Sequence, residues 1–273
     1  MITSAELHRF AASEGLRFDQ IEKDYVILWL LFTLRRVLGV SARWTLKGGT
    51  CLRHCYYPGY RFSDDIDFTC ETEADNTQSS LATLGAATRM AESETGLRLV
   101  LKEPLASVSE KQLEVGIEYS RGGARRQHLP VVQVHLTFDE PLMRPAEERA
   151  VRPAYSDLAA FHVGCYSMME IAAEKLRSLL QQQEKWPRPR DLYDLWFMLC
   201  RRGEPLRGPG LLVLFESKCR LRGIVPDSSQ LFSDQLREWN RQAWATQLAP
   251  TMRAAPDYDV VWRDWTSIRA TIF

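Results

Sequence analysis

The sequence has no excess of charge of either sign, because 35 Lys and Arg balance 35 Asp and Glu over 273 residues. No overall field therefore attracts nucleic acid, and such a partner needs a local basic surface. The N-terminus lacks a basic-then-apolar signal pattern, and the longest apolar run, around Val26 to Leu34, is short for a membrane span. Internal repeats and low-complexity segments are absent as well. We expect a cytoplasmic protein of enzyme size.

The six cysteines form no Cys-x-x-Cys pair, and a chain of this length does not need disulfide bonds to fold. Cys51 and Cys55 lie four residues apart on a predicted helix. A zinc site would need further ligands at matching spacing, and the sequence shows none. We interpret these two cysteines as partly buried thiols.

Hydrophobic periodicity and glycine or proline breaks divide the chain into a half with strands and a helical half. The pattern predicts an α+β fold, with an N-terminal mixed-sheet domain over residues 1–152 and a C-terminal helical domain over residues 153–273. The boundary falls between Pro145 and Pro153, and we expect the active site in the cleft between the domains. The expected strands are 44–47, 61–70, 97–102, 113–119 and 131–138. The expected helices are two within 4–38, then 50–56, 77–94, 167–183, 191–202, 209–221, 229–247 and 258–271.

The pair Gly48-Gly49 stands between a predicted strand and a predicted helix, and an aspartate pair follows on the next strand. The glycines leave backbone N–H groups able to approach an anion at the start of the helix. Asp65 and Asp67 are two residues apart on a strand, so their side chains point to the same face. Like charges on one face cost stability unless a cation lies between them, and Mg²⁺ prefers such oxygen ligands. The motif predicts a phosphate cradle beside a metal site, which is the equipment for nucleotidyl transfer.

Two features of the helical half have both a structural and a functional interpretation. Lys175 falls in the apolar stripe of its helix, either as a packed stem whose amine reaches water or as an ammonium that holds a triphosphate. Asp191 suits the N-terminal cap of the next helix, and composition alone favours that interpretation. Asp191 and Asp194 can alternatively orient Lys175, and Arg190 can face a phosphate.

Four sequence elements occur in a fixed order along the chain. They are Lys47-Gly48-Gly49-Thr50-x-Leu52, Arg61-x-Ser63-x-Asp65-Ile66-Asp67-Phe68, Glu174-Lys175 and Arg190-Asp191-Leu192-Tyr193-Asp194-Leu195. Together they resemble the AbiEii/AbiGii-type nucleotidyltransferase toxins of type IV toxin–antitoxin systems, within the DNA-polymerase-β-like nucleotidyltransferase superfamily. The segment Glu22-Lys23-Asp24-Tyr25 also looks like the opening helix of that family. The last of the four elements makes the narrower resemblance specific.

The resemblance implies a role for each matching residue. The implied catalytic residues are Asp65, Asp67, Lys175 and Asp191, of which Asp65 and Asp67 bind Mg²⁺. The implied nucleotide-binding residues are Lys47, Gly48, Gly49, Thr50, Arg61, Ser63, Arg190 and Asp194. The resemblance further implies nucleotide transfer from NTP to RNA, at a tRNA 3′ end, which stops translation. It also implies an antitoxin encoded alongside, which in the AbiE systems is a DNA-binding repressor.

One position departs from the superfamily pattern, which usually has a third carboxylate on a neighbouring strand. This chain has His135 there, and Glu118 or Asp139 are alternative acids. From the residues alone, His135 fits a metal ligand, a general base or an exposed strand residue. Two other functions remain open, namely nucleotide transfer to protein hydroxyls and a non-catalytic relative that binds nucleotide or a partner. For an RNA acceptor, a local basic surface can come from Arg121, Arg125, Arg126, Arg188 and Arg190.

Overall fold

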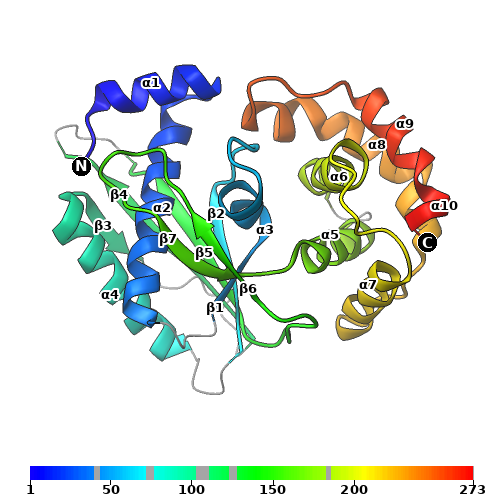
Figure 1. Cartoon of the computed structure of the whole chain (residues 1–273), viewed down its shortest axis with the longest axis horizontal. Coiled ribbons are helices and arrows are strands. Elements are labelled where there is room, and N and C mark those ends of the chain that lie inside the picture. Colours follow the sequence, from blue (N-terminus) through cyan, green and yellow to red (C-terminus); the bar gives the residue numbers. More distant parts are fainter. Residues whose placement is uncertain (40–43, 72–76, 103–110, 123–127, 183–185, 273) are drawn as a thin grey trace. The chain divides into compact units, whose positions relative to one another are not determined.

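The structure is a computed structural model of the chain, and it describes residues 1–39, 44–71, 77–102, 111–122, 128–182 and 186–272 (Figure 1). The chain divides into two compact units, Met1–Tyr166 and Ser167–Phe273, called unit 1 and unit 2 below. Each unit is described by itself. Within the described residues, no helix is both long and apolar enough to cross a membrane.

Unit 1 combines a mixed sheet with helices, as the sequence predicted. Its strands are β1 (Trp44–Lys47), β2 (Asp65–Cys70), β3 (Arg98–Leu101), β4 (Gln112–Ser120), β5 (Val131–Thr137), β6 (Glu147–Val151) and β7 (Phe161–Cys165). Its helices are α1 (Ser4–Glu14), α2 (Phe18–Leu38), α3 (Gly48–Cys51), the π-helical turn η1 (Leu52–Tyr56) and α4 (Thr77–Thr95). The strands form one sheet in the order β3-β4-β5-β2-β1-β7-β6 (Figure 1). The pairs β2–β5 and β1–β7 are parallel, and the other neighbours are antiparallel.

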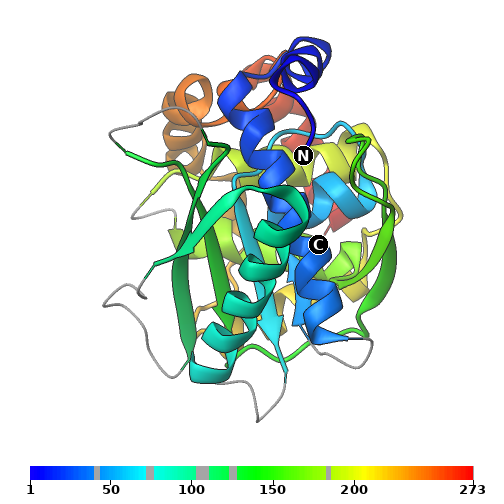
Figure 2. The same ribbon diagram turned by 90° about the vertical axis from the view of Figure 1, so that its left-hand side faces the viewer.

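The two faces of the sheet have different partners. Helices α2 and α4 pack against each other and lie on one side of the strands (Figure 2). On β2, the buried side chains of Ile66 and Phe68 alternate with those of Asp65 and Asp67. The aspartates therefore face away from the apolar side chains of their own strand, and toward α3, whose first residue contacts Asp67.

The expectation that the chain is helical after about residue 156 was wrong. β7 follows that position, and β6 lies within the stretch where the boundary was placed. The edge strand β6 carries charged residues instead of an apolar alternation, as edge strands commonly do, and β7 is short and contains Gly164. Both strands belong to the sheet, so unit 1 ends at Tyr166 rather than at residue 152.

Unit 2 is helical throughout its described residues. Its elements are α5 (Met168–Gln182), α6 (Pro189–Trp196), η2 (Phe197–Arg201), α7 (Pro209–Leu221), η3 (Ser228–Phe232), α8 (Asp234–Ala243), η4 (Trp244–Leu248), η5 (Ala249–Thr251), α9 (Tyr258–Ser267) and α10 (Arg269–Ile272). The helix expected over 229–247 is interrupted, because Ser233 is extended and its side chain caps α8. The core of this unit contains an ion pair between Lys218 Nζ of α7 and Glu170 Oε1 of α5 at 2.9 Å, and both side chains are fully buried.

Candidate active site

Four charged or titratable residues form one row across the sheet. Lys47 of β1 pairs with Asp67 of β2, Asp67 pairs with His135 of β5, and His135 pairs with Glu114 of β4. Directly paired residues on neighbouring strands share a face, so the row lies on one side of the sheet. Asp65 is two residues before Asp67 and belongs to the same face. The aspartate pair predicted from the sequence thus lies beside a cation and a histidine.

The two glycines of the turn make room for predicted site residues. Gly48 has a φ of +74°, a conformation that favours glycine, and a Cβ there would lie 2.5 Å from Oδ2 of Asp67. A Cβ on Gly49 would lie 2.7 Å from Oγ of Ser63 and 3.0 Å from Nη2 of Arg61. Both Ser63 and Arg61 are buried. The missing side chains therefore allow Asp67, Ser63 and Arg61 to approach the start of α3.

Thr50 links this turn to the aspartate strand. Its side chain is fully buried, and Thr50 Oγ1 donates a hydrogen bond to the backbone oxygen of Asp65. The hydroxyl thus fixes α3 against the first residue of β2. Because the hydroxyl is used in this way, binding of a nucleotide by Thr50 would involve its backbone N–H, and that role stays a prediction.

Negative charge accumulates at the aspartate pair. Burial, followed by the neighbouring carboxylates of Asp64 and Asp67, raises the pKa of Asp65 to about 6. Among the residues that the structure describes, neither Asp65 nor Asp67 forms an ion pair with a lysine or arginine. A carboxylate in such surroundings gains free energy from a nearby cation, and paired carboxylate oxygens suit a hard divalent ion. The donor set therefore fits a divalent metal.

His135 occupies the position next to Asp67 on β5, with Nδ1 2.9 Å from Asp67 Oδ1. This hydrogen bond raises the pKa of His135, while burial opposes the shift. Of the alternative acids, Glu118 lies four residues along β4 from Glu114 and pairs with Lys102 at 3.1 Å, and Asp139 comes after the end of β5. The acid in the row is Glu114, which the sequence analysis missed because the register between β4 and β5 places it there.

Lys47 is engaged inside unit 1. Its Nζ lies 3.1 Å from Glu140 Oε2 and 3.3 Å from Thr137 Oγ1, and 5.7 Å from the centroid of the Tyr166 ring. The side chains of Lys47 and Glu140 are 9% and 4% exposed. The ammonium thus neutralises a buried carboxylate on the same side of the sheet as Asp67. Direct contact of Lys47 with a nucleotide stays a prediction.

In unit 2, Lys175 of α5 forms two ion pairs with residues of α6. Its Nζ lies 2.7 Å from Asp191 Oδ1 and 2.6 Å from Asp194 Oδ2, and Ser178 Oγ donates to the other oxygen of Asp191 at 3.0 Å. Burial raises the pKa of Asp191, but Lys175 and then Arg188 outweigh it and hold that pKa below its usual value. The amine of Lys175 is buried between carboxylates, which excludes the interpretation of a lysine that reaches water.

Two interpretations of neighbouring residues need correction. Asp191 lies in the first turn of α6 but does not cap it, because the helix begins at Pro189 after Arg188. Arg121 donates from Nη2 to the backbone oxygen of Ile2 and lies 5.7 Å from the Tyr25 ring, so it is used within unit 1. Arg190 donates from Nε to the Gln247 backbone oxygen at 3.2 Å, and a role in phosphate binding stays a prediction. The remaining basic loop positions, Arg125 and Arg126, lie outside the described residues.

The comparisons with known proteins identify the family and the fold of this chain. The family model described as nucleotidyl transferase AbiEii toxin, type IV toxin–antitoxin system, matches residues 29–269. Comparison with curated proteins gave no match. Among solved structures, JHP933 of Helicobacter pylori is 14% identical, with 93% of this chain and 92% of that chain covered and a TM-score of 0.61. The nucleotidyltransferase toxin MenT4 of Mycobacterium tuberculosis is 18% identical, with coverage of 90% and 99% and a TM-score of 0.51. These structures share the fold.

A mixed sheet that presents two aspartates beside a glycine turn defines a nucleotidyltransferase, a class of enzyme that generally uses a divalent metal. The chain belongs to the AbiEii nucleotidyltransferase toxin family. Membership in a type IV toxin–antitoxin family implies an NTP substrate and an antitoxin partner.

Proposed function

We propose that this enzyme is a Mg²⁺-dependent toxin that transfers a nucleotide from NTP to the 3′ end of a tRNA and so inhibits translation. The observation that carries the proposal is the Asp65–Asp67 pair, held on one face of β2 against Gly48 with no lysine or arginine partner among the described residues. Asp65 and Asp67 are the residues that would hold Mg²⁺. When bound, the ion supplies charge stabilisation to phosphate oxygens and orients the reacting groups.

The residues of the glycine turn then bind and orient the triphosphate. Gly48 and Gly49 let backbone N–H groups approach phosphate oxygens at the start of α3. Arg61 and Ser63 lie against Gly49, so their guanidinium and hydroxyl groups are close to the same turn. Little covalent chemistry is required of these side chains, because positioning and electrostatic stabilisation carry most of the rate.

His135 has the properties of the base that a carboxylate at its position would otherwise supply. An imidazole that donates from Nδ1 to Asp67 keeps Nε2 as a proton acceptor, and the hydrogen bond fixes the orientation of the ring. The raised pKa of His135 favours proton uptake from an acceptor hydroxyl. We assign His135 this role, with Asp67 as the residue that positions it.

Unit 2 contributes Lys175 and Asp191 to the same proposal. Lys175 contacts the triphosphate, and Asp191 and Asp194 hold its ammonium until the nucleotide arrives. Arg190, in the first turn of α6, is the residue that we assign to phosphate contact beside Lys175. The family supports a cytoplasmic toxin that is neutralised by an antitoxin, and we propose that this antitoxin is a DNA-binding repressor.

The test is transfer of label from each NTP, radiolabelled on the α-phosphate, to total tRNA in the presence of Mg²⁺. Wild type is compared with Asp67→Asn and Lys175→Ala, and Asp64→Asn serves as a control that removes a neighbouring charge without removing a proposed ligand. We expect Asp67→Asn to lose on the order of 100-fold or more of the rate. Label on protein instead of tRNA would show that the acceptor is a protein hydroxyl and not tRNA. Nucleotide binding without transfer would overturn the catalytic proposal.

A further inference from the structure

Three of the six cysteines come together at the end of α3. Cys51 is the last residue of α3, Cys55 lies one turn later in η1, and Cys165 ends β7. Their sulfur atoms all lie within 4.8 Å of one another. The parallel pairing of Leu46 with Cys165 brings the end of β7 to the strand that leads into α3. The third sulfur ligand, which spacing in the sequence does not reveal, is therefore supplied by the fold.

The spacing of the sulfur atoms suits a single metal ion. A thiolate binds Zn²⁺ at about 2.3 Å, so three sulfur atoms around one ion are about 4 Å apart. The observed separations of up to 4.8 Å then require a movement of less than about 1 Å. Cys51 and Cys165 are fully buried and Cys55 is partly exposed, and all three are free thiols. Soft sulfur ligands select thiophilic ions such as Zn²⁺ and Cu⁺ over Mg²⁺.

The surroundings of the three sulfur atoms compensate negative charge. Hydrogen bonds from Cys51 and Cys55 lower the pKa of Cys165 to about 4, with a further contribution from Arg149. The Arg149 guanidinium lies 4.4 Å from the centroid of the Tyr56 ring. These hydrogen bonds and Arg149, whose guanidinium also pairs with Glu147 at 2.6 Å, favour the thiolate form of Cys165, which is the form that binds metal.

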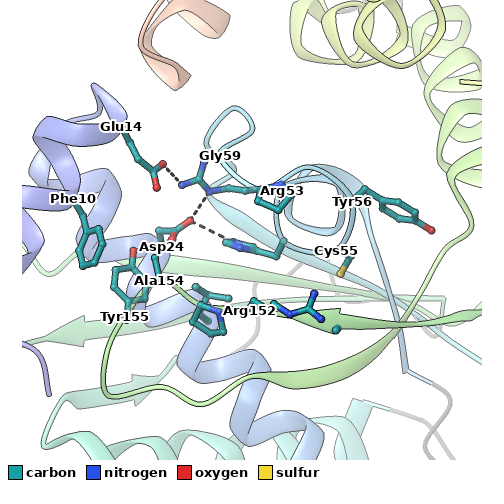
Figure 3. A pocket seen from close by; sticks show the side chains of 15 residues that line it. Phe10, Glu14, Asp24, Arg53, Cys55, Tyr56, Gly59, Arg152, Ala154 and Tyr155 are labelled. Carbon is teal, nitrogen blue, oxygen red and sulfur yellow. Dashed lines mark hydrogen bonds and ion pairs between the residues drawn. The ribbon is translucent and has the colours of Figure 1, made fainter. Parts of the chain in front are cut away.

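The site also has a path to solvent. A cavity of about 290 Å³ in unit 1 is lined by Cys55 and Tyr56, among other residues. Figure 3 shows Cys55 and Tyr56 toward one end of this pocket, with Phe10 and Glu14 toward the other. A metal ion can therefore reach Cys55 without unfolding of the sheet, and water from the cavity can complete its coordination.

We propose that Cys51, Cys55 and Cys165 form a binding site for one thiophilic metal ion, Zn²⁺ or Cu⁺, separate from the aspartate site. Binding of the ion forms three metal–sulfur bonds and releases to solvent the protons that the three cysteines carry. The bound ion links α3, η1 and β7 to one another next to the glycine turn.

The experiment uses the full chain, reduced and freed of metal under anaerobic conditions. Co²⁺ is added as a spectroscopic probe for Zn²⁺, because thiolate ligands give a charge-transfer band in the near ultraviolet, and Zn²⁺ is then used to displace it. Cu⁺ is titrated in competition with a chromophoric chelator, and proton release is followed with an indicator dye. Binding of Zn²⁺ or of Cu⁺ identifies the ion, and a failure of both to bind with thiolate signatures overturns the proposal.

The matched variants are Cys55→Ser and Cys200→Ser, because both thiols are partly exposed and Cys200, in unit 2, is not one of the three clustered cysteines. We expect Cys55→Ser to weaken metal binding by roughly 100-fold and Cys200→Ser to leave it unchanged. Equal binding by wild type and Cys55→Ser overturns the proposal. Alkylation of wild-type protein, mapped by mass spectrometry, gives a readout that needs no variant. Metal must protect Cys55 and leave Cys200 reactive, and equal protection of both counts against the site.

Discussion

Replacement of Gly48 by alanine tests whether the turn exists to accommodate Asp67. The new Cβ would lie 2.5 Å from Asp67 Oδ2, and ordinary contact begins at 3.4 Å, so the oxygen must move by about 0.9 Å. A misplacement of about 1 Å in an active site costs roughly 100-fold in rate. Alanine at a φ of +74° also costs about 1–2 kcal/mol of stability. We expect Gly48→Ala to fold and to lose roughly 100-fold of kcat/KM.

Gly96→Ala is the matched control. Gly96 has the same φ of +74°, and a Cβ there would have nothing within 4 Å. The two variants therefore share the backbone strain, but only Gly48→Ala displaces Asp67. Urea unfolding measures the stability of both, and Mn²⁺ binding and nucleotide transfer measure the site. If Gly48→Ala and Gly96→Ala retain equal activity, the proposed packing of Asp67 against the turn is refuted.

Three further predictions concern the site and the core. His135→Gln should leave Mn²⁺ binding nearly intact and lower kcat by about 100-fold, in the range of general-base catalysis, and unchanged kcat in a pH-rate profile would remove His135 as the base. Glu170→Gln should cost about 3–5 kcal/mol in urea unfolding because Lys218 remains charged and buried, and Glu170→Leu with Lys218→Met should recover most of that loss. Burial raises the pKa of Asp24, but Arg53 and then His54 outweigh it and hold the pKa below its usual value of about 4. The advantage of wild type over Asp24→Asn should therefore be full above about pH 4 and decline as the pH falls below it, and a pH-independent difference would contradict the assignment.

The sequence predicts most elements of this fold because their signals are local. The helix over 209–221 is found with the bounds expected, and the strand 44–47 likewise, since apolar periodicity and flanking glycines or prolines mark both. β6 was missed because an edge strand with charged side chains shows no apolar alternation, and β7 was missed because its alternation covers only five residues, one of them a glycine. Their membership of the sheet depends on pairing across it, which no local window contains.

The site residues also fall into those that the sequence predicts and those that only the fold brings together. Gly48, Asp65 and Asp67 can be predicted because the chemistry depends on spacings of a few residues within one turn and one strand. Glu114 and Cys165 could not be predicted, because register and strand order bring them to their neighbours. Residues that meet through pairing across the sheet become visible only in the structure.

The two groups of predicted aspartates show why only one of them needs an external cation. Asp191 has Lys175 as a built-in partner, and its pKa lies below the usual value despite burial. Asp65 is half-buried, and its burial together with the carboxylates of Asp64 and Asp67 raises its pKa to about 6. The same residue type is thus shifted in opposite directions by its surroundings, because Asp191 has an ammonium beside it and Asp65 has further carboxylates. A cation supplied with the nucleotide satisfies the second arrangement, and the first already contains its own.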